Sequence, residues 1–597
     1  ATVVSVEAAP GDRVRAGACL VVLQAMKMEH VLAAPVSGTV GEVHTFVGAT
    51  VTQGDLLLGL TPDETQEESD TLQSGVDLDH VRPDLADVLE RHALGTDERR
   101  PEAVAERHRL GRRTARENIT DLCDGGGFTE YGALTVAAQH GRRSEEDLAA
   151  NTPADGMVTG IGRVNPDLHP DNSDCVVMSY DYTVMAGTQG IMNHRKTDRM
   201  LEIAYRRRLP VVLFAEGGGG RPGDIDPNTA SSLDVTTFAE MGRLSGHVPT
   251  VGVASGRCFA GNAALLGCCD VVIATPDATI GMGGPAMIEG GGLGTYRPEE
   301  VGPVQVQEPN GVIDLLVEDG PAAVGASKKY LSYFQGPVED WDMADQRLLR
   351  HVVPENRLRV YDVRRAIHTI ADTGSVLELR RRFGPGVVTA LVRVEGRPMG
   401  LIANDPAHLG GAIDADGADK IARFLQLCDA HELPVLSLCD TPGFMVGPDA
   451  ERTATVRHFS RLFVIGSQLR VPLVAVILRK GYGLGAQAMA GGHLRAPVAT
   501  LAWPTGELGP MGLEGAVRLG FRRELEAIED PEERAAAFDE ILAEAYRRGK
   551  ASHAASVFEL DDVIDPVDTR KWITSALGEG PGGARDRGDT GRYVDPW

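Results

Sequence analysis

The sequence predicts a multidomain protein in which a small all-β domain is followed by two fused domains of one α/β fold. The prediction rests on two internal repeats. One has a spacing of 37 residues within the first sixty, and the other has a spacing of about 224 over most of the remainder. An acidic, polar stretch separates the two repeated regions. With 597 residues, the chain is long enough for about four domains of average size.

Residues 1–60 repeat a frame of valine and glycine. Short β runs punctuated by glycine predict a two-part β sandwich or barrel. The counterpart of residues 34–38 would fall mostly before residue 1, so we expect this domain to be truncated and the chain to be a piece of a longer polypeptide. The matched positions are Thr2, Val3, Val6, Gly11, Val14 and Gly17 in the first copy and Thr39, Val40, Val43, Gly48, Val51 and Gly54 in the second.

A single lysine stands at the centre of this repeat, within Ala25-Met26-Lys27-Met28-Glu29. The centre of a two-fold β repeat is expected to be a hairpin tip, where Lys27 is accessible to a modifying enzyme. The motif resembles biotin carboxyl carrier domains, which implies covalent biotin on Lys27, attached by a biotin protein ligase, with Met26 and Met28 beside the cofactor. Lipoyl domains typically read Asp-Lys-Ala here, and the alternative is an ordinary solvated lysine.

Residues 61–95 are acidic and polar with little apolar periodicity, which predicts a mobile linker. If fully flexible, a linker of this length has an end-to-end reach on the order of 35 Å.

Residues 96–340 and 341–575 are predicted to be two copies of one α/β domain, and residues 576–597 a tail. Apolar β runs alternate with helical segments in each copy, a pattern typical of mostly parallel strands. The matched positions include Lys196, Arg199, Leu209 and Pro210 in the first copy and Lys420, Arg423, Leu433 and Pro434 in the second.

Two glycine-rich runs follow β segments of these copies: Glu216-Gly217-Gly218-Gly219-Gly220-Arg221 and Arg479-Lys480-Gly481-Tyr482-Gly483-Leu484-Gly485-Ala486. Glycine lets backbone N–H groups approach a ligand oxygen, and a helix N-terminus adds partial positive charge. Paired amides of this kind stabilise an oxyanion. The alternative for each run is a tight turn, and neither run fits a dinucleotide fingerprint or a P-loop. Two matched holes indicate a reaction in which two carbonyl oxygens become negative.

Residues 96–575 resemble the carboxyltransferase component of biotin-dependent acyl-CoA carboxylases, such as propionyl- and long-chain acyl-CoA carboxylases. That component consists of two fused crotonase-type (ClpP/crotonase) domains. The absence of a Cys-x-x-Cys pair disfavours the type with a zinc ribbon, and we expect no metal site. The motifs that carry the resemblance are Thr114-Ala115-Arg116-Glu117-Asn118-Ile119, Gly283-Gly284-Pro285, Asp440-Thr441-Pro442-Gly443-Phe444, Arg479-Lys480-x-Tyr482-Gly483 and Asp561-Asp562-Val563-Ile564-Asp565-Pro566.

The resemblance also implies roles for individual residues. Gly218 and Gly219 would hold the acyl-CoA thioester oxygen, and Leu484 and Gly485 the biotin ureido oxygen. Small-acyl members have Asp or Ile where this chain has Gln487, which leaves room for longer acyl chains. The remaining expected site residues are Gly483 for biotin and Gly217, Gly220, Arg221, Gly283, Gly284 and Gln487 for the acyl-CoA substrate.

The implied reaction is carboxyl transfer from carboxybiotin on Lys27 to the α-carbon of an acyl-CoA, which gives a malonyl-type CoA and needs no side-chain base. ATP, Mg and bicarbonate would be needed only by a biotin carboxylase part. We expect that part upstream in the same chain or on a partner subunit. The family also implies a ring-shaped homo-hexamer. Lys196, Arg199, Arg479 and Lys480 either face CoA phosphates or the carboxylate, or are solvated charges.

Composition narrows the class of protein. The formal net charge of −26 argues against a nucleic-acid binder. No run of 18 uncharged apolar residues and no leader pattern is present, so we expect no membrane association. Eight scattered cysteines predict reduced thiols and a cytoplasmic location, with Cys268, Cys269 and Cys439 as buried apolar residues.

Three other functions remain open at this stage. A biotin-dependent decarboxylase or transcarboxylase would run the same half-reaction in another direction. A non-catalytic carrier scaffold would keep the lysine without using the glycine turns. A crotonase-type hydratase would not need a lysine carrier.

Overall fold

The computed structural model describes residues 1–63, 77–221, 223, 224, 226, 233–578 and 592–597. The chain divides into two compact units, Ala1–Leu85 and Ala86–Trp597. Among the described residues, no helix combines the length and apolar character needed to cross a membrane, and no cluster of His, Cys, Asp or Glu could hold a metal ion.

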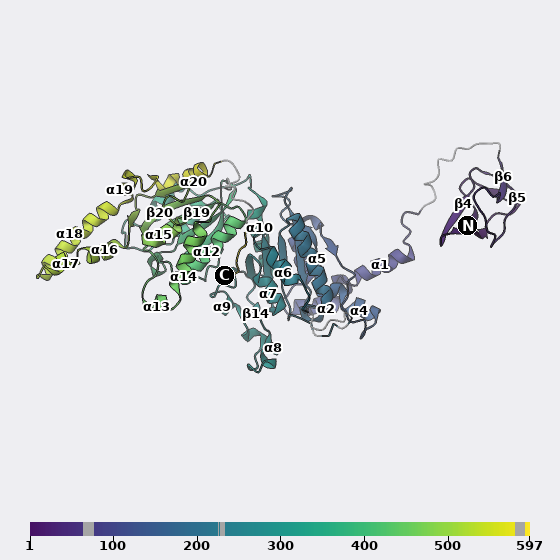
Figure 1. Cartoon of the computed structure of the whole chain (residues 1–597), viewed down its shortest axis with the longest axis horizontal. Helices are drawn as coiled ribbons and strands as arrows, with labels where there is room; N and C mark the ends of the chain where they lie inside the picture. The colour runs from purple at the N-terminus through teal and green to yellow at the C-terminus, as the bar shows by residue number, and fades with distance from the viewer. Residues whose placement is uncertain (64–76, 222, 225, 227–232, 579–591) are drawn as a thin grey trace. The chain divides into compact units, whose positions relative to one another are not determined.

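The first unit contains two antiparallel three-stranded sheets, β1-β3-β4 and β2-β5-β6, around a small core (Figure 1). The sequence repeat is visible in the register. Thr2 pairs with Gln24, and 37 residues later Thr39 pairs with Thr61. The strands are β1 (Thr2–Val6), β2 (Arg13–Val14), β3 (Cys19–Ala25), β4 (Met28–Ala33), β5 (Gly38–Val43) and β6 (Leu58–Pro62).

The segment expected to be a linker, 61–95, has ordered ends. Its first residues complete β6, where Pro62 lies opposite Gly38. Its last part contains helix α1 (Pro83–Ala93), which has no buried residue. The middle of the expected linker, 64–76, lies outside the described residues.

The second unit contains two halves, which we define as residues 96–340 (the first half) and 341–575 (the second half). Each half is built on a mixed sheet with an antiparallel edge and a parallel centre. The central strands are buried on both faces, which explains their continuous apolar sequences, such as Val211–Phe214. The boundary expected at 340/341 falls between the last helix of the first half and the first strand of the second.

The two sheets have corresponding strand orders, β15-β13-β11-β10-β9-β8-β7 and β23-β21-β20-β19-β18-β17-β16. In the first half the strands are β7 (Thr129–Tyr131), β8 (Met157–Arg163), β9 (Asp174–Tyr180), β10 (Val211–Phe214), β11 (Thr250–Ala254), β13 (Val271–Ala274) and β15 (Leu315–Leu316), with β12 (Arg257–Phe259) and β14 (Thr279–Gly281) as a separate pair. In the second half they are β16 (Leu377–Leu379), β17 (Val387–Val394), β18 (Arg397–Asn404), β19 (Val435–Thr441), β20 (Leu473–Tyr482), β21 (Ala499–Ala502), β22 (Glu507–Gly509) and β23 (Asp562–Val563).

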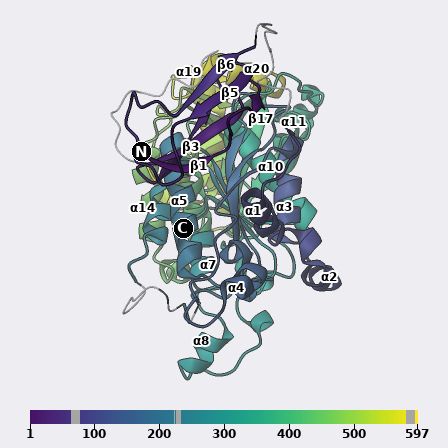
Figure 2. The same ribbon diagram turned by 90° about the vertical axis from the view of Figure 1, so that its right-hand side faces the viewer.

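Helices pack against these sheets, and several begin with a side-chain cap. Thr114 and Glu117 form a capping box at the start of α3, and α3 packs beside α10 (Figure 2). The helices of the first half are α2 (Pro101–Arg109), α3 (Ala115–Leu122), α4 (Glu145–Asn151), α5 (Ile191–Arg207), α6 (Thr237–Arg243), α7 (Gly261–Gly267), α8 (Pro285–Gly290), α9 (Val304–Gln307) and α10 (Gly320–Gln335). Those of the second half and its C-terminal extension are α11 (Arg364–Ile370), α12 (Ala415–Ala430), α13 (Pro448–Glu451), α14 (Thr455–Gly466), α15 (Gly483–Met489), α16 (Leu513–Gly520), α17 (Arg522–Glu526), α18 (Pro531–Gly549), α19 (Ala551–Ser556) and α20 (Thr569–Leu577).

The repeat of 224 residues is reproduced bond by bond. Gln189 forms a parallel bridge with Gly220, and Ile413 forms the same bridge with Phe444. The Gln189 N–H donates to Gly219 O at 2.7 Å, and the Ile413 N–H donates to the oxygen of the corresponding residue, Gly443, at 3.1 Å. The two halves therefore share one fold in the same register.

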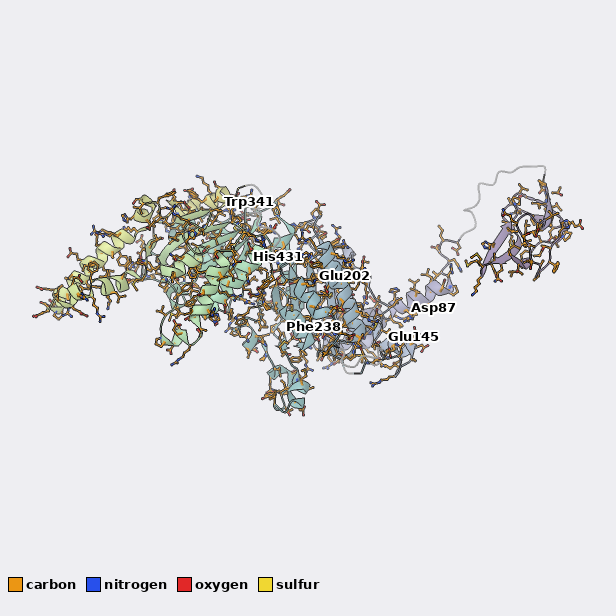
Figure 3. All side chains as sticks on the ribbon, viewed as in Figure 1. Asp87, Glu145, Glu202, Phe238, Trp341 and His431 are labelled. Carbon is orange, nitrogen blue, oxygen red and sulfur yellow. The ribbon has the colours of Figure 1, made fainter. Side chains whose placement is uncertain are left out.

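The two halves pack against each other through a common hydrophobic cluster and through buried charges. His431, labelled in Figure 3, lies at this junction and contacts the Asp270 carboxylate at 3.2 Å. Arg423 donates to Asp270 O at 2.7 Å. The expected linkage of the halves into one compact body is thus made by side chains from both sequences.

The end of the described chain, residues 592–597, packs into this junction, although we expected residues 576–597 to be a tail. The Val594 backbone exchanges hydrogen bonds with the Ser245 hydroxyl of the first half. Asp595 accepts from Arg461 of the second half at 2.6 Å, and the Trp597 ring packs edge-on against Phe383. We call residues 592–597 the C-terminal clasp. The preceding stretch, 579–591, lies outside the described residues.

Candidate active site

Lys27 lies at the tip of the β3–β4 hairpin, as the repeat predicts. Ala25 pairs with Met28, so the loop consists of only Met26 and Lys27. Both have positive φ values, 54° and 65°, the geometry of the tight turn that best matches strand twist. Such a conformation is unfavourable for residues other than glycine, by about 1 kcal/mol or more each. The backbone therefore holds the lysine in the turn, with its side chain exposed to solvent.

The glycine run of the first half forms a tight turn at the carboxyl end of β10. Gly217 N–H donates to Arg257 O at 2.7 Å, and Gly219 N–H donates to the side-chain oxygen of Asn262 at 2.9 Å. Gly219 has a φ of +89°, and a Cβ there would lie 2.5 Å from the Ala260 Cβ. The Gly219 amide, expected to face the thioester oxygen, is thus paired with Asn262, whereas Gly218 is exposed at the surface of the turn.

Helix α7 supplies amides beside this turn that the sequence reasoning missed. Its first N–H groups, at Gly261 and Asn262, have no acceptor within the helix because they belong to its first turn. Asn262 joins the helix to the turn, since its side chain also donates to Gly187 O at 3.2 Å. The 224-residue repeat contains the missing signal, because Leu484 and Gly485 minus 224 are Ala260 and Gly261.

Gly283 and Gly284 are brought to the same region by the pairing of β12 with β14, in which Phe259 lies opposite Gly281. A Cβ on Gly284 would lie 3.3 Å from the Phe259 ring, so this turn packs closely against the entry to α7. The structure therefore groups the two glycines with the first-half turn, as the family resemblance implied.

Arg221, expected at the substrate, is instead engaged in internal ion pairs. Its side chain is almost wholly buried and contacts the carboxylates of Asp155 and Asp224. It also donates to Thr188 O at 3.0 Å. In this geometry the guanidinium stabilises the far side of the turn, and Gly220 beside it is exposed.

In the second half, α15 begins where β20 ends. Leu484 is 59% exposed, and both Leu484 and Gly485 contribute first-turn amides without an intrahelical acceptor. Gly485 touches the neighbouring turn so closely that a Cβ would lie 2.8 Å from the Gly443 backbone. Gly483 has a φ of +59°, and Gln487 is exposed on the same helix. These residues form one contiguous group, as expected.

The two glycine-rich runs do not occupy equivalent positions, although the sequence reasoning matched them as related points. Gly217–Gly220 corresponds to Thr441–Phe444, because both follow equivalent strands and bridge to Gln189 and Ile413. The run at Leu484–Gly485 corresponds to the start of α7. Each half therefore combines a strand-end turn with a helix N-terminus, and glycine content alone obscured this correspondence.

The cations considered for CoA binding differ in their surroundings. Lys196 is buried, donates to Ala154 O and Met157 O, and has a pKa lowered to about 8 by burial. Arg479 is also buried and contacts Asp440. Arg199 is exposed and pairs with Glu202 at 2.7 Å. Lys480 is partly exposed, and burial lowers its pKa from the usual value.

The cysteines are not placed for nucleophilic chemistry. Cys269 and Cys439 are buried and Cys268 is partly buried. Burial raises the pKa of the Cys439 thiol to about 12, so little thiolate is present near neutral pH.

Comparison with known proteins identifies both parts of the chain. The family described as "Carboxyl transferase domain" matches residues 106–578. The chain belongs to this family. Residues 1–60 match the family described as "Biotin-requiring enzyme". The expected recognition, fold class and enzyme class are thereby confirmed: the chain is a biotin-dependent carboxyltransferase that transfers a carboxyl group between biotin and an acyl-CoA.

Individual relatives refine this picture. The methylmalonyl-CoA carboxyltransferase 12S subunit of Propionibacterium freudenreichii subsp. shermanii is 34% identical over 508 residues, which cover 83% of this chain and 93% of the relative. A solved single-chain, multi-domain long-chain acyl-CoA carboxylase is 60% identical with a TM-score of 0.80, covering 96% of this chain. This chain spans 55% of the length of that carboxylase. The transcarboxylase 12S hexamer structure is 30% identical, with a TM-score of 0.73 over 87% of this chain and 100% of that chain.

Proposed function

We propose that this carboxyltransferase carries its biotin on Lys27 and acts on long-chain acyl-CoA thioesters. The exposed two-residue hairpin tip supports the modification, because it presents a single lysine without obstruction. The substrate class is supported by the 60% identity to a long-chain acyl-CoA carboxylase and by Gln487 in place of the expected Asp or Ile.

Biotin, when attached to Lys27, supplies the carboxyl group and a nitrogen base for the α-proton. The chain's own part is to hold two oxygens as they become negative. In our proposal the exposed Gly218 amide, together with the first-turn amides of α7, receives the acyl thioester oxygen. The Leu484 and Gly485 amides receive the biotin ureido oxygen. Preorganised N–H donors of this kind lower the barrier because they need no reorientation during the reaction.

The partners belong to the same proposal. A biotin carboxylase part, in the same polypeptide or on a separate subunit, would load the biotin with ATP, Mg and bicarbonate. A biotin protein ligase would attach it. We also propose a homo-hexamer, supported by the hexamer assembly of the transcarboxylase 12S structure, and a cytoplasmic location. Native mass spectrometry of the purified chain tests the hexamer.

The decisive experiment couples modification to transfer. The chain is co-expressed with a biotin protein ligase and incubated with malonyl-CoA homologues of increasing alkyl length, and carboxylation of the Lys27 peptide is followed by mass spectrometry. We expect biotin on Lys27, none in Lys27→Arg, normal biotinylation in the control Lys571→Arg, and the fastest transfer from long-chain homologues. Biotin at another residue would refute the first part, and fastest transfer from the shortest homologue would refute the second.

A transcarboxylase is the second candidate, favoured by the 34% identity to the methylmalonyl-CoA carboxyltransferase 12S subunit. It differs in its partner reaction, because it passes the carboxyl group to a second acceptor without ATP. Rapid transfer from methylmalonyl-CoA that exceeds transfer from every longer homologue would favour this reading.

A further inference from the structure

Each half buries one carboxylate at the carboxyl end of an equivalent strand, directly before or within the turn that borders the amide group. Glu216 precedes Gly217, and Asp440 lies 224 residues later, next to Thr441. The two carboxylates are 7% and 0% exposed. They are too deep to contact a ligand in solution, and the proposed reaction does not use them.

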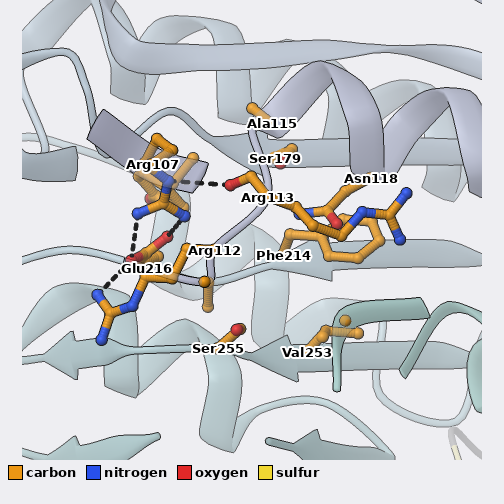
Figure 4. A pocket seen from close by; sticks show the side chains of 14 residues that line it. Arg107, Arg112, Arg113, Ala115, Asn118, Ser179, Phe214, Glu216, Val253 and Ser255 are labelled. Atoms are coloured by element: carbon orange, nitrogen blue, oxygen red, sulfur yellow. Dashed lines mark hydrogen bonds and ion pairs between the residues drawn. The ribbon is translucent and has the colours of Figure 1, made fainter. Parts of the chain in front are cut away.

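Glu216 is held by two arginines from the segment before α3 (Figure 4). Arg107, in α2, donates to both carboxylate oxygens at 2.9 and 2.7 Å, and Arg112 donates to Oε1 at 3.3 Å. Arg112 continues to Asp277 at 3.1 Å. The adjoining cavity of about 40 Å³ is far smaller than a ligand pocket, so these arginines do not form an acyl-CoA site.

Asp440 is held by a different set of donors. Its Oδ2 accepts from Arg479 Nε at 3.1 Å and from the Tyr361 hydroxyl at 2.8 Å, and its Oδ1 accepts from the Lys480 N–H at 3.2 Å. Arg479 also donates to the carbonyl oxygens of Arg357 and Arg359. The carboxylate thus ties β19, β20 and the segment before α11 together.

Both carboxylates connect to the amides through one further contact. The Asn262 side chain bonds both the Glu216 carbonyl, at 3.4 Å, and the Gly219 N–H, at 2.9 Å, so the strand end, turn and α7 form one unit. In the second half, the turn after Asp440 contains Gly443, against which Gly485 of α15 packs directly.

A buried ion pair adds little net stability over apolar residues of the same shape, whereas it fixes one geometry strongly. We propose that Glu216 and Asp440 are positioning residues that set the two groups of amides at the distance an oxyanion requires. This rests on the proposed function. Glu216 acts on the first-half group through the Gly217–Gly220 turn, and Asp440 acts on the second-half group through the Thr441–Phe444 turn.

The test uses Glu216→Gln and Asp440→Asn in the biotinylated full chain, with Asp314→Asn as the matched control. Asp314 is also buried and paired with an arginine, Arg380 at 3.0 Å, but it binds the amide of Val272 at the amino end of β13, the opposite edge of the sheet. Kinetics of carboxyl transfer are measured with thermal melting, and backbone hydrogen exchange is measured by mass spectrometry.

We expect each test variant to lower kcat by about 10- to 100-fold while KM for the acyl-CoA changes less than about twofold, because misplaced oxyanion donors weaken the transition state more than the ground state. Exchange should accelerate in residues 217–220 only for Glu216→Gln and in residues 441–444 only for Asp440→Asn. Asp314→Asn should lower the melting temperature and leave kcat within about twofold of wild type.

Equal losses of kcat in all three variants, or unchanged exchange in both turns, would overturn the positioning role. If Glu216→Gln does not fold, Arg112→Gln removes one of the three hydrogen bonds to Glu216 and is expected to give the same pattern at smaller amplitude. The hydrogen exchange distinguishes the two proposals. Absent transfer in wild type refutes the proposed function, whereas local exchange that fails to respond refutes the positioning role.

Discussion

The two halves of the carboxyltransferase agree in their buried polar residues and differ in their turns. Lys196 and Lys420 are buried at equivalent positions, and both donate to backbone carbonyls. Asp181 and Asp405 each accept from the N–H two residues later. In contrast, the strand-end turn is four glycines in the first half and Thr441–Phe444 in the second.

This difference shows which features of a duplicated fold carry its register. Buried charges are costly to leave without partners, so a change at one position requires changes at several others. Turn residues facing solvent or a ligand are under no such constraint and diverge with the ligand. Correspondence between the halves is therefore read from the lysines and carboxylates, and glycine content indicates only where a turn occurs.

The largest expected effect breaks the second half alone. In Gly485→Ala, the added methyl would lie 2.8 Å from the Gly443 backbone, which has no flexible side chain to move away. We expect carboxyl transfer to fall more than about 100-fold, as when an oxyanion donor is displaced. Gly515→Ala on α16, where a Cβ meets nothing within 4 Å, is the control, with rates measured by peptide mass. Transfer above one tenth of wild type would show that the α15 amides are not needed.

The corresponding change in the first half is Gly219→Ala. The φ of +89° disfavours alanine, and the new Cβ would lie 2.5 Å from the Ala260 Cβ. Because that neighbour is a side-chain atom at the start of α7, some adjustment is available, and we expect a smaller loss of transfer, about 10- to 100-fold. Gly267→Ala, at the open end of α7, controls for changes in the helix. A loss larger than that of Gly485→Ala would reverse the ranking of the two sites.

The buried lysines give the halves different pH dependences of stability. Burial lowers the pKa of Lys420 to about 7 and that of Lys196 to about 8, from 10.5 in both cases. The unfolded chain therefore binds more protons than the folded chain above these values. Each group makes stability rise with pH, from about 7 for Lys420 and from about 8 for Lys196, up to about 10.

Lys420→Met should flatten this rise more than Lys196→Met, because the pKa of Lys420 is shifted further. The full contribution of one such lysine is about 1.4 kcal/mol per pH unit within its range. Melting temperatures at pH 6, 7.5 and 9 measure the effect for the wild type and both variants. Parallel pH profiles for all three proteins would show that the lysines titrate alike in the folded and unfolded chain.

The smallest expected effect concerns the contact between the halves. Val594 is 6% exposed and belongs to the hydrophobic cluster shared by both halves. Val594→Ala removes two buried methyl groups and should lower the free energy of unfolding by about 1 to 2 kcal/mol. Denaturant titration measures this, with Val557→Ala at an exposed site as the control. Equal midpoints would indicate that the clasp contributes no stability.

Much of the fold could be predicted from the sequence because repeats report register. The spacing of 37 placed Lys27 at a hairpin tip, and the spacing of 224 matched Lys196 with Lys420. Contacts between distant residues were not predictable. Arg221 pairs with Asp155, 66 residues away, which no local pattern indicates.

The amides of α7 were missed for a related reason. The start of this helix contains a single glycine, Gly261, and its neighbour Asn262 acts through side-chain bonds to a turn more than 40 residues away. The sequence reasoning followed glycine density, which led to Gly218 and Gly219. Only the register of the folded sheets shows that the helix start corresponds to Leu484 and Gly485.

The C-terminal clasp has a consequence for the order in which the protein is made. Ser245 binds Val594, a residue 349 positions later in the chain. At typical rates of synthesis, roughly 20 to 70 seconds separate the appearance of the two residues at the ribosome. During that interval the surface around Ser245 and the cationic groups of Arg423 and Arg461 lack the partners that the clasp provides. A newly made chain is therefore most exposed to misassembly with other chains just before its synthesis reaches residue 592.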